Sequence, residues 1–333
     1  MEFAIAFQGN KTPDEYVALA RLVNNYAFDV VSVYNDLLFQ PALGPLLWMA
    51  PHLDRPKRIG FAALNPYTVH PIEIAGQAAL LDMATNGRAY LGLARGAWLD
   101  QIGVVQDYPL EWLTETVLAV KHLLRTDPNE FAGSRIHLPA GMGLNYSVLR
   151  SQIPIMIGTW GRRTAMMAGC LADEVKIGGS ANPEMVGVIG PAIRAGEKQA
   201  ARPVGSVGLC LGAVTVVDSD RSAARARVRR EAALYLPVTA ALDPTLKDEE
   251  WLTRLKTAAD LKDYEALSGL ISDDILEKFA FSGNPRDIIR QTQSLLEAGA
   301  TRVEFGTPHG LTISADGIKL LGEHVLPYFR ERD

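Results

Sequence analysis

Short apolar runs alternate along the chain with longer stretches in which apolar residues recur at helical spacing. Runs of this length are typical of buried strands, and the longer stretches have the pattern of amphipathic helices. The sequence therefore predicts eight strands with helices between them. The predicted strands are residues 3–7, 29–34, 58–63, 89–94, 153–157, 174–177, 209–217 and 301–305. The predicted helices include residues 71–84, 109–124, 163–172, 183–200 and 285–298.

This alternation indicates βαβ units and a parallel sheet. Eight such units favour closure into a barrel over an open, doubly wound sheet. An open sheet of that kind usually carries a Gly-x-Gly-x-x-Gly turn after its first strand. Here Gln8-Gly9-Asn10 follows the first strand without that spacing. We expect one α/β domain over residues 1–333, a (β/α)8 TIM barrel with insertions.

Two stretches interrupt the regular alternation. Residues 126–152 contain several glycines between aromatic or β-branched runs, which predicts a short hairpin excursion. Residues 241–282 are polar and helical in pattern, and we interpret them as an insertion after strand seven. Because segments that follow barrel strands lie on the face that carries the chemistry, this insertion is a candidate lid or dimer contact.

The composition limits the kinds of molecule that the protein is expected to bind. The 333 residues are 48% hydrophobic with a net charge of −5, which gives no sign of nucleic-acid binding. No apolar run approaches the ~20 residues of a membrane span, and the N-terminus lacks a signal-peptide pattern. Cys170 and Cys210 lie in apolar surroundings, as buried thiols of a reducing compartment do. We expect a cytoplasmic protein that acts on a small molecule.

In a barrel, the residues that follow the strands build the active site. The loop after strand five, Gly158-Thr159-Trp160-Gly161, has two glycines three positions apart and is followed by Arg162. Glycines let the backbone approach a ligand, and the next helix offers free N–H groups and a positive dipole end. The loop is therefore a candidate phosphate site, with a plain tight turn as the alternative. The neighbouring turn at Gly178 and Gly179 would add N–H donors.

Few polar side chains at the strand ends suit acid–base chemistry. Asp36 is a carboxylate directly after strand two, and it suits hydrogen bonding to a cofactor ring or proton transfer. The alternatives are a helix cap or an ion pair with Arg95. His309 is a candidate proton donor, with an exposed loop histidine as its alternative. The six histidines show no metal-ligand spacing, so we expect no metal.

At this point the chain resembles a known family. Four blocks in order are similar to the luciferase-like superfamily of flavin- and F420-dependent oxidoreductases. They resemble most the branch that holds methylenetetrahydromethanopterin reductase, which uses the deazaflavin coenzyme F420. The blocks are residues 60–71 (GFAALNPYTVHP), 87–96 (GRAYLGLARG), 153–178 (IPIMIGTWGRRTAMMAGCLADEVKIG) and 281–321, which includes GATRVEFGTPHG. The resemblance covers nearly the whole chain and implies a luciferase-like TIM barrel, commonly a homodimer.

The resemblance also implies roles for individual residues. The peptide between Ala62 and Ala63 matches a non-prolyl cis bond that forms a bulge behind the deazaflavin ring. Leu64 and Asn65 would line the ring, and Asp36 would lie near it. The phosphate would bind the loop after strand five and the adjoining turn. With strand-end neighbours included, the expected cofactor-binding set is Asn35, Asp36, Ala62, Ala63, Leu64, Asn65, Arg95, Gly158, Thr159, Trp160, Gly161, Arg162, Gly178 and Gly179.

One departure from the family pattern concerns the reaction. The reductases of that branch carry a glutamate in strand one, and Ala6 occupies the corresponding position here. We therefore expect a relative with a different substrate, whose proton donor is Asp36, Tyr34, His309 or water. The favoured function is an F420-dependent reductase that transfers a hydride to an electron-poor C=C, C=N or C=O bond. The alternatives are an FMN-dependent monooxygenase and a barrel that binds a ligand or partner without catalysis.

Overall fold

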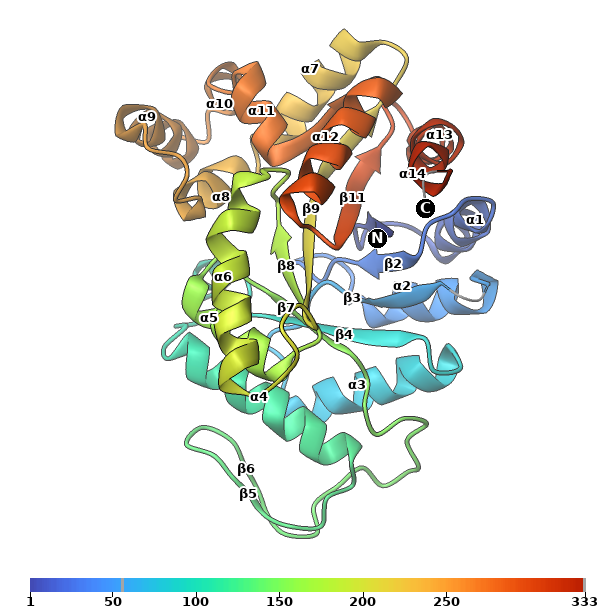
Figure 1. Ribbon diagram of the computed structural model, residues 1–333, viewed down its shortest axis with the longest axis vertical. Helices are drawn as coiled ribbons and strands as arrows, with labels where there is room; N and C mark the ends of the chain where they lie inside the picture. Colours follow the sequence, from blue (N-terminus) through green and yellow to red (C-terminus); the bar gives the residue numbers. More distant parts are fainter. Residues whose placement is uncertain (55–56, 332–333) are drawn as a thin grey trace.

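A computed structural model describes residues 1–54 and 57–331 and contains a closed barrel of eight parallel strands (Figure 1). Around the barrel the strand order is β1-β2-β3-β4-β7-β8-β9-β11, and β11 returns to pair with β1. The first five barrel strands are β1 (Glu2–Phe7), β2 (Val30–Val33), β3 (Arg58–Phe61), β4 (Ala89–Ala94) and β7 (Ile155–Gly158). The other three are β8 (Glu174–Gly178), β9 (Gly208–Val217) and β11 (Arg302–His309). The predicted TIM barrel is thus confirmed.

The sheet holds one strand that the sequence pattern did not predict. β10 (Ala280–Gly283) pairs with the last residues of β9. Val214 of β9 pairs with both Ala280 and Gly306, so β10 lies on the edge of β9 opposite β11. β8 occupies the same edge of β9 nearer to the start of that strand, where Glu174 of β8 pairs with Gly208 of β9. The end of the expected helical insertion is therefore a strand that continues the barrel wall.

Helices cover the outside of the barrel, and some of them begin at clear capping signals. Thr12 caps the first helix and forms a reciprocal capping box with Glu15. His70 caps α3, its ring accepting a hydrogen bond from the N–H of Ile72. The helices of the barrel layer are α1 (Pro13–Asn24), α2 (Leu43–Met49), α3 (Pro71–Ala84), α4 (Pro109–Leu124), α5 (Arg162–Leu171), α6 (Glu184–Gln199), α7 (Arg221–Ala232) and α12 (Pro285–Ala298). The C-terminal helices are α13 (Ser314–Leu320), the π-helical η3 (Leu321–Val325) and α14 (Leu326–Arg330).

Two groups of elements project from the barrel at opposite ends of the molecule (Figure 1). The short antiparallel pair β5 (Phe131–Ala132) and β6 (His137–Leu138) lies beyond α4. The other group follows β9 and contains α8 (Leu236–Leu242), α9 (Glu249–Asp260), α10 (Tyr264–Gly269) and α11 (Asp273–Phe279). It is tied to the loop after β8, because Asn182 donates hydrogen bonds to Asp243 and Thr245, both at 2.9 Å. This helical group therefore lies next to the carboxyl ends of the strands.

The inside of the barrel is unusually polar for a buried space. Arg302 of β11 is fully buried and pairs with Glu174 of β8 at 2.7 Å. One layer further along the strands, the ammonium of Lys176 forms an ion pair with the carboxylate of Glu304. Ser32 donates a hydrogen bond to Glu304 at 2.6 Å. Apolar side chains fill the space between strands and helices, so the charges are confined to the barrel axis. No helix in the described part of the chain is long and apolar enough to span a membrane.

Candidate functional site

A hydrogen bond between Gln8 and Asp36 marks the centre of the barrel mouth. Gln8 follows β1 and Asp36 lies just beyond β2, so the two side chains meet above adjacent strands. Nε2 of Gln8 donates to Oδ2 of Asp36 at 3.0 Å. Burial raises the pKa of Asp36 above its usual value, and the hydrogen bond from Gln8 and the charge of Lys176 partly offset that effect. The alternative interpretation of Asp36, an ion pair with Arg95, does not occur among the described residues, and Arg95 is exposed.

Tyr34 lies beside Asp36 and reaches across the barrel. Its hydroxyl is close to Gly306, where an added Cβ would come within 2.5 Å of it. The Lys176 ammonium lies over the Tyr34 ring, 5.2 Å from the centroid. Burial raises the pKa of Tyr34 well above its usual value, and the charges of Glu304 and Asp36 add to that effect. Tyr34 is therefore a neutral phenol, and Asp36 is the more acidic of the two candidate proton donors.

Tyr235, which the sequence analysis missed, also faces this carboxylate. It stands directly before α8, and its ring packs on Trp98 with centroids 5.7 Å apart. Burial and then the charge of Asp36 raise the pKa of Tyr235 to about 12. Tyr235 lies between the predicted strand at 209–217 and the predicted insertion at 241–282, so neither prediction included it. Trp98 and Tyr235, which are far apart in the sequence, therefore pack together as an aromatic pair.

The peptide bond between Ala62 and Ala63 is cis, as the family resemblance implied. β3 ends just before it, and Leu64 then forms an isolated bridge with Leu93 of β4. The N–H of Leu64 donates to the carbonyl of Gly92 at 2.9 Å. Ala62 and Ala63 therefore lie outside the strand, and the pairing with β4 resumes at Leu64. This arrangement produces a bulge at the carboxyl end of β3.

Two asparagines of the expected cofactor set hold loops in place. Oδ1 of Asn65 accepts hydrogen bonds from the N–H of Tyr67 at 3.1 Å and from Thr68 N–H at 3.0 Å. Oδ1 of Asn35 accepts from the N–H of Ala42 at 3.0 Å. Because these carbonyl oxygens are already in use, only the amide NH2 groups remain for a ligand. Sequence reasoning placed both residues near the mouth and missed their anchoring role.

The loop after β7 leads into the N-terminus of α5, where the sequence predicts a phosphate site. Gly161 caps this helix without a side-chain hydrogen bond. Arg162 and Arg163 are exposed and form no ion pair among the described residues. Thr159 supports the turn, since its Oγ1 accepts from the N–H of Gly161 at 3.0 Å. Free N–H groups, a helix dipole and unpaired cations together favour phosphate binding.

The turn at Gly179 does not add N–H donors to this site, which corrects the expectation above. Gly179 has a φ of 77°, and its N–H donates to the carbonyl of Gly212 at 2.7 Å. The N–H of Ser180 donates to the same carbonyl at 3.1 Å. The carbonyl of Gly178 accepts from the Trp160 indole at 3.0 Å. Tertiary pairing with β9 therefore consumes the donors of this turn.

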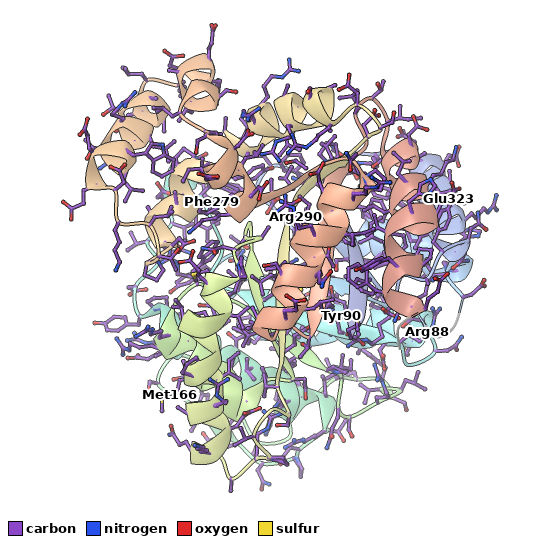
Figure 2. The ribbon with its side chains drawn as sticks, turned by 45° about the horizontal axis from the view of Figure 1, so that its top comes forward. Arg88, Tyr90, Met166, Phe279, Arg290 and Glu323 are labelled. Atoms are coloured by element: carbon purple, nitrogen blue, oxygen red, sulfur yellow. The ribbon has the colours of Figure 1, made fainter. Side chains whose placement is uncertain are left out.

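The Trp160 side chain turns away from the anion site. Its ring stacks on Phe279, with centroids 6.4 Å apart and planes at 17°. Phe279, labelled in Figure 2, ends α11 and packs in the second apolar core beneath the helical group. The Trp160 indole thus joins the Gly158–Gly161 loop to the helical group.

His309 differs from both interpretations given to it. It is fully buried at the end of β11, not in an exposed loop. Nδ1 lies 2.8 Å from Oγ of Ser314, and Nε2 lies 3.2 Å from the carbonyl oxygen of Phe305. Burial lowers the pKa of His309 to about 3. A neutral ring held at both nitrogens is a poor proton donor, and its contacts instead join β11 to α13.

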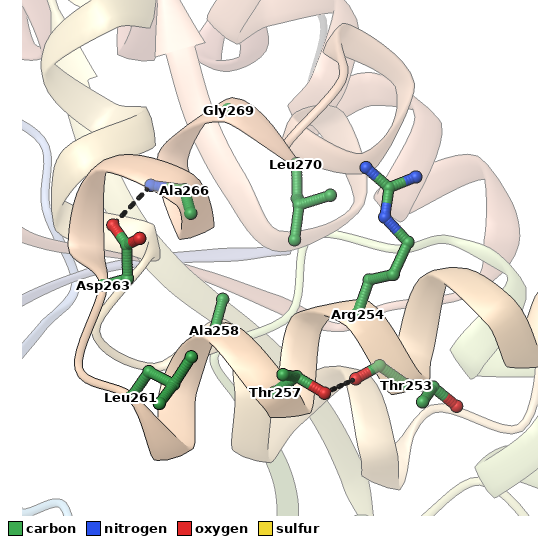
Figure 3. Close-up of a pocket in the computed structure, with 9 residues that line it drawn as sticks. All are labelled: Thr253, Arg254, Thr257, Ala258, Leu261, Asp263, Ala266, Gly269 and Leu270. Carbon is green, nitrogen blue, oxygen red and sulfur yellow. Dashed lines mark hydrogen bonds between the residues drawn. The ribbon is translucent and has the colours of Figure 1, made fainter.

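A groove lies away from the barrel mouth, between α9 and α10 (Figure 3). Its volume is about 470 Å³, and Arg254, Leu261 and Leu270 are among its lining residues. The hydrogen bonds drawn there stay within the helices, such as Asp263 to the N–H of Ala266. Among the described residues, no cluster of His, Cys, Asp or Glu side chains could hold a metal ion. The candidate site therefore remains at the barrel mouth and not at the groove between α9 and α10.

The structure combines a parallel barrel, a bulge after its third strand, and a helix N-terminus that carries two exposed arginines. The family described as luciferase-like monooxygenase matches residues 1–302, and the chain belongs to this family. Relatives include the 5,10-methylenetetrahydromethanopterin reductase of Methanopyrus kandleri, 25% identical over 99% of both chains. The F420-dependent glucose-6-phosphate dehydrogenase 2 of Rhodococcus jostii is 26% identical, covering 89% of this chain and 88% of its own. The solved structure of the F420-dependent tetrahydromethanopterin reductase from M. kandleri has a TM-score of 0.89 at 24% identity, covering 98% of this chain and 99% of its own.

Proposed function

We propose that this protein is an F420-dependent oxidoreductase that transfers a hydride between the deazaflavin and a small organic substrate. The observation that carries the proposal is the anion site at the N-terminus of α5, on the same barrel face as the bulge at Ala62–Ala63. Relatives over most of the chain are named as F420-dependent enzymes, which supports this cofactor over FMN. When bound, the deazaflavin would supply a two-electron hydride carrier.

The residues of the chain have separate tasks in this proposal. Arg162 and the N-terminus of α5, which the Gly158–Gly161 loop leads into, hold the phosphate, and Ala62, Ala63 and Leu64 support the ring. Asp36 holds the proton that complements hydride transfer, because burial keeps it protonated to a higher pH than an exposed aspartate. The substrate is an electron-poor C=C, C=N or C=O compound that enters beside Trp98 and Tyr235.

The test is to measure binding of F420 and of FMN to the purified protein by absorbance and fluorescence titration. We expect F420 to bind and FMN to bind at least tenfold more weakly. Arg162→Ala should weaken F420 binding about tenfold, as expected for one charge-assisted phosphate contact. Arg21→Ala, on the exposed last turn of α1, is the matched control and should leave affinity unchanged. Tight FMN binding without F420 affinity would refute the proposal and favour a monooxygenase.

We further propose that residues 1–333 form one domain that acts as a cytoplasmic homodimer. The pairing of β1 with β11 joins both ends of the chain in one barrel, which supports a single domain. Free Cys170 and Cys210 suit a reducing compartment. Exposed Trp48 and Leu80 offer apolar surface for a second copy. Light scattering on the purified protein tests the dimer, and a monomer at micromolar concentration would contradict it.

A further inference from the structure

The short helix α8 contacts the ends of two barrel strands that are not neighbours. Tyr235, directly before α8, packs its ring on Trp98 of the loop after β4. Further along the helix, Thr239 lies against the turn after β8, where a Cβ added to Gly179 would come within 2.8 Å of the threonine methyl group. In the barrel, β7 lies between β4 and β8. The helix therefore passes the carboxyl end of β7.

The length of α8 fits this path. An α-helix rises about 1.5 Å per residue, so Tyr235 and Asp243, at its two ends, are roughly 12 Å apart along the axis. Two steps between neighbouring strands of a sheet amount to about 10 Å. The helix is thus long enough to reach from β4 to β8 past the end of β7, where the Gly158–Gly161 loop begins.

A buried polar contact holds the end of α8 on the loop after β8. Nδ2 of Asn182 donates to Oδ2 of Asp243 and to Oγ1 of Thr245, both at 2.9 Å. Asn182 is fully buried and Asp243 is 3% exposed. Oδ1 of Asn182 accepts from the N–H of Glu184 at 3.1 Å, and Oδ1 of Asp243 accepts from the N–H of Thr245 at 2.8 Å. Since every polar atom of the two side chains has a partner, the amide has a single orientation.

Stability alone is a poor explanation for this contact. Asp243 forms no ion pair among the described residues, and a buried carboxylate without a counter-charge is costly. Apolar side chains of similar volume would be buried at a lower cost. Hydrogen bonds are directional, however, so they hold α8 in one position on the loop, which apolar contacts do not.

The other end of the helical group has attachments of its own. The N–H of Ala181 donates to the carbonyl of Lys278 at 2.8 Å, and Trp160 stacks on Phe279. These contacts hold α11 on the barrel and do not involve α8. Loss of the contact between Asn182 and Asp243 should therefore release α8 without releasing α11.

We propose that α8 is a strap that retains the deazaflavin in the barrel mouth, and that Asn182 and Asp243 are the positioning residues that keep it closed. A cofactor held at the end of β7 leaves more slowly while α8 is in place. The inference rests on the proposed function for the identity of the retained molecule. The closure of the strap itself can be measured without a ligand.

The first experiment is hydrogen–deuterium exchange on the full-length protein, which reports local opening. We expect Asn182→Ala to speed amide exchange in residues 234–245 about ten- to a hundredfold, because it removes buried hydrogen bonds, one of them to a carboxylate. The double variant Asn182→Asp with Asp243→Asn exchanges the amide and the carboxylate and should restore protection. Failure of this double variant to restore it would overturn the role of the pair.

Asn24→Ala is the matched control for a general loss of stability. Asn24, at the end of α1, also forms two hydrogen bonds, with the carbonyl of His52 at 2.5 Å and the N–H of Asp54 at 3.0 Å. This variant should lower the urea midpoint of unfolding and leave exchange in residues 234–245 as in the wild type. Equal acceleration in Asn24→Ala and Asn182→Ala would mean that α8 opens only with the whole fold, and the strap would be refuted.

The second experiment measures how fast F420 leaves the protein, from the change in its fluorescence on dilution. Asn182→Ala should raise the dissociation rate about tenfold, and the double variant should return it toward that of the wild type. An unchanged rate in a variant whose α8 exchanges faster would overturn retention by the strap. If the wild type does not bind F420 at all, the proposed function fails, and the exchange data still decide whether Asn182 and Asp243 hold α8 closed.

Discussion

Gln8 and Asp36 are joined by a hydrogen bond of 3.0 Å between the ends of two adjacent strands, β1 and β2. A carboxylate oxygen can only accept, so the amide nitrogen of Gln8 must face Asp36. The amide oxygen of Gln8 is buried and has no hydrogen-bond partner in the described part of the chain. A protonated Asp36 could donate to that oxygen while still accepting from the amide nitrogen. The pair is therefore suited to both protonation states of Asp36.

Asp36→Asn should lower the rate of substrate reduction by about 10²- to 10⁴-fold, the usual contribution of a general acid. Since the pKa of Asp36 is raised, the protonated acid persists to a higher pH than in a free aspartate, and the wild-type rate should fall as pH rises through that pKa. The measurement is the pH profile of kcat/KM. Asp14→Asn, in the first turn of α1, is the control. A wild-type rate in Asp36→Asn would remove Asp36 from the mechanism.

Replacing Asn65 should show that its carbonyl anchors the turn after the bulge. Asn65→Ala removes an acceptor of three hydrogen bonds, from Tyr67 N–H and from the N–H and hydroxyl of Thr68. We expect a loss of about 1–3 kcal/mol in the free energy of unfolding. Asn65→Asp keeps the acceptor oxygen and should lose less. Chemical denaturation of both variants is the measurement, and equal losses would argue against the anchoring role.

The buried His309 should make the protein less stable as pH falls. The unfolded chain takes up a proton near the usual pKa of about 6.5, whereas the folded chain resists protonation down to about 3. The resulting cost begins below pH 6.5 and reaches roughly 2 kcal/mol at pH 5. His309→Asn should flatten this dependence, and asparagine tolerates the positive φ of 71° at this position. Denaturation midpoints at pH 7 and pH 5 are compared, and identical slopes in both proteins would contradict the prediction.

The buried ion pair between Glu174 and Arg302 should contribute far more to stability than the partly exposed pair of Glu2 and Arg58. Glu174→Gln leaves a fully buried guanidinium without its counter-charge, which should cost about 3–5 kcal/mol. The matched control is Glu2→Gln, because the pair of Glu2 with Arg58 is about one-third exposed and should contribute at most about 1 kcal/mol. Urea denaturation of both variants measures the difference. Similar losses would mean that burial does not govern the strength of these pairs.

The sequence by itself determined the barrel, because each strand and helix is specified by a local pattern of apolar residues. The α3 and α12 helices, whose predicted and observed ends coincide, begin with a cap followed by proline. The resemblance to the family likewise lay in continuous segments, and the cis bond at Ala62–Ala63 could be inferred from one of them. The candidate phosphate loop could be proposed from the sequence because all its groups are adjacent in the chain.

Only the tertiary structure decided what the long-range contacts do. The N–H of Gly179 is hydrogen-bonded only because the chain brings Gly212, 33 residues further along, next to it. His309 is buried because α13 folds over it. The partners Lys176 and Glu304 are 128 residues apart. In both strands, charged residues alternate with apolar ones. This alternation was the sole signal in the sequence that charges lie inside the barrel. Periodicity shows which residues face inward, but only closure of the barrel shows which of them meet.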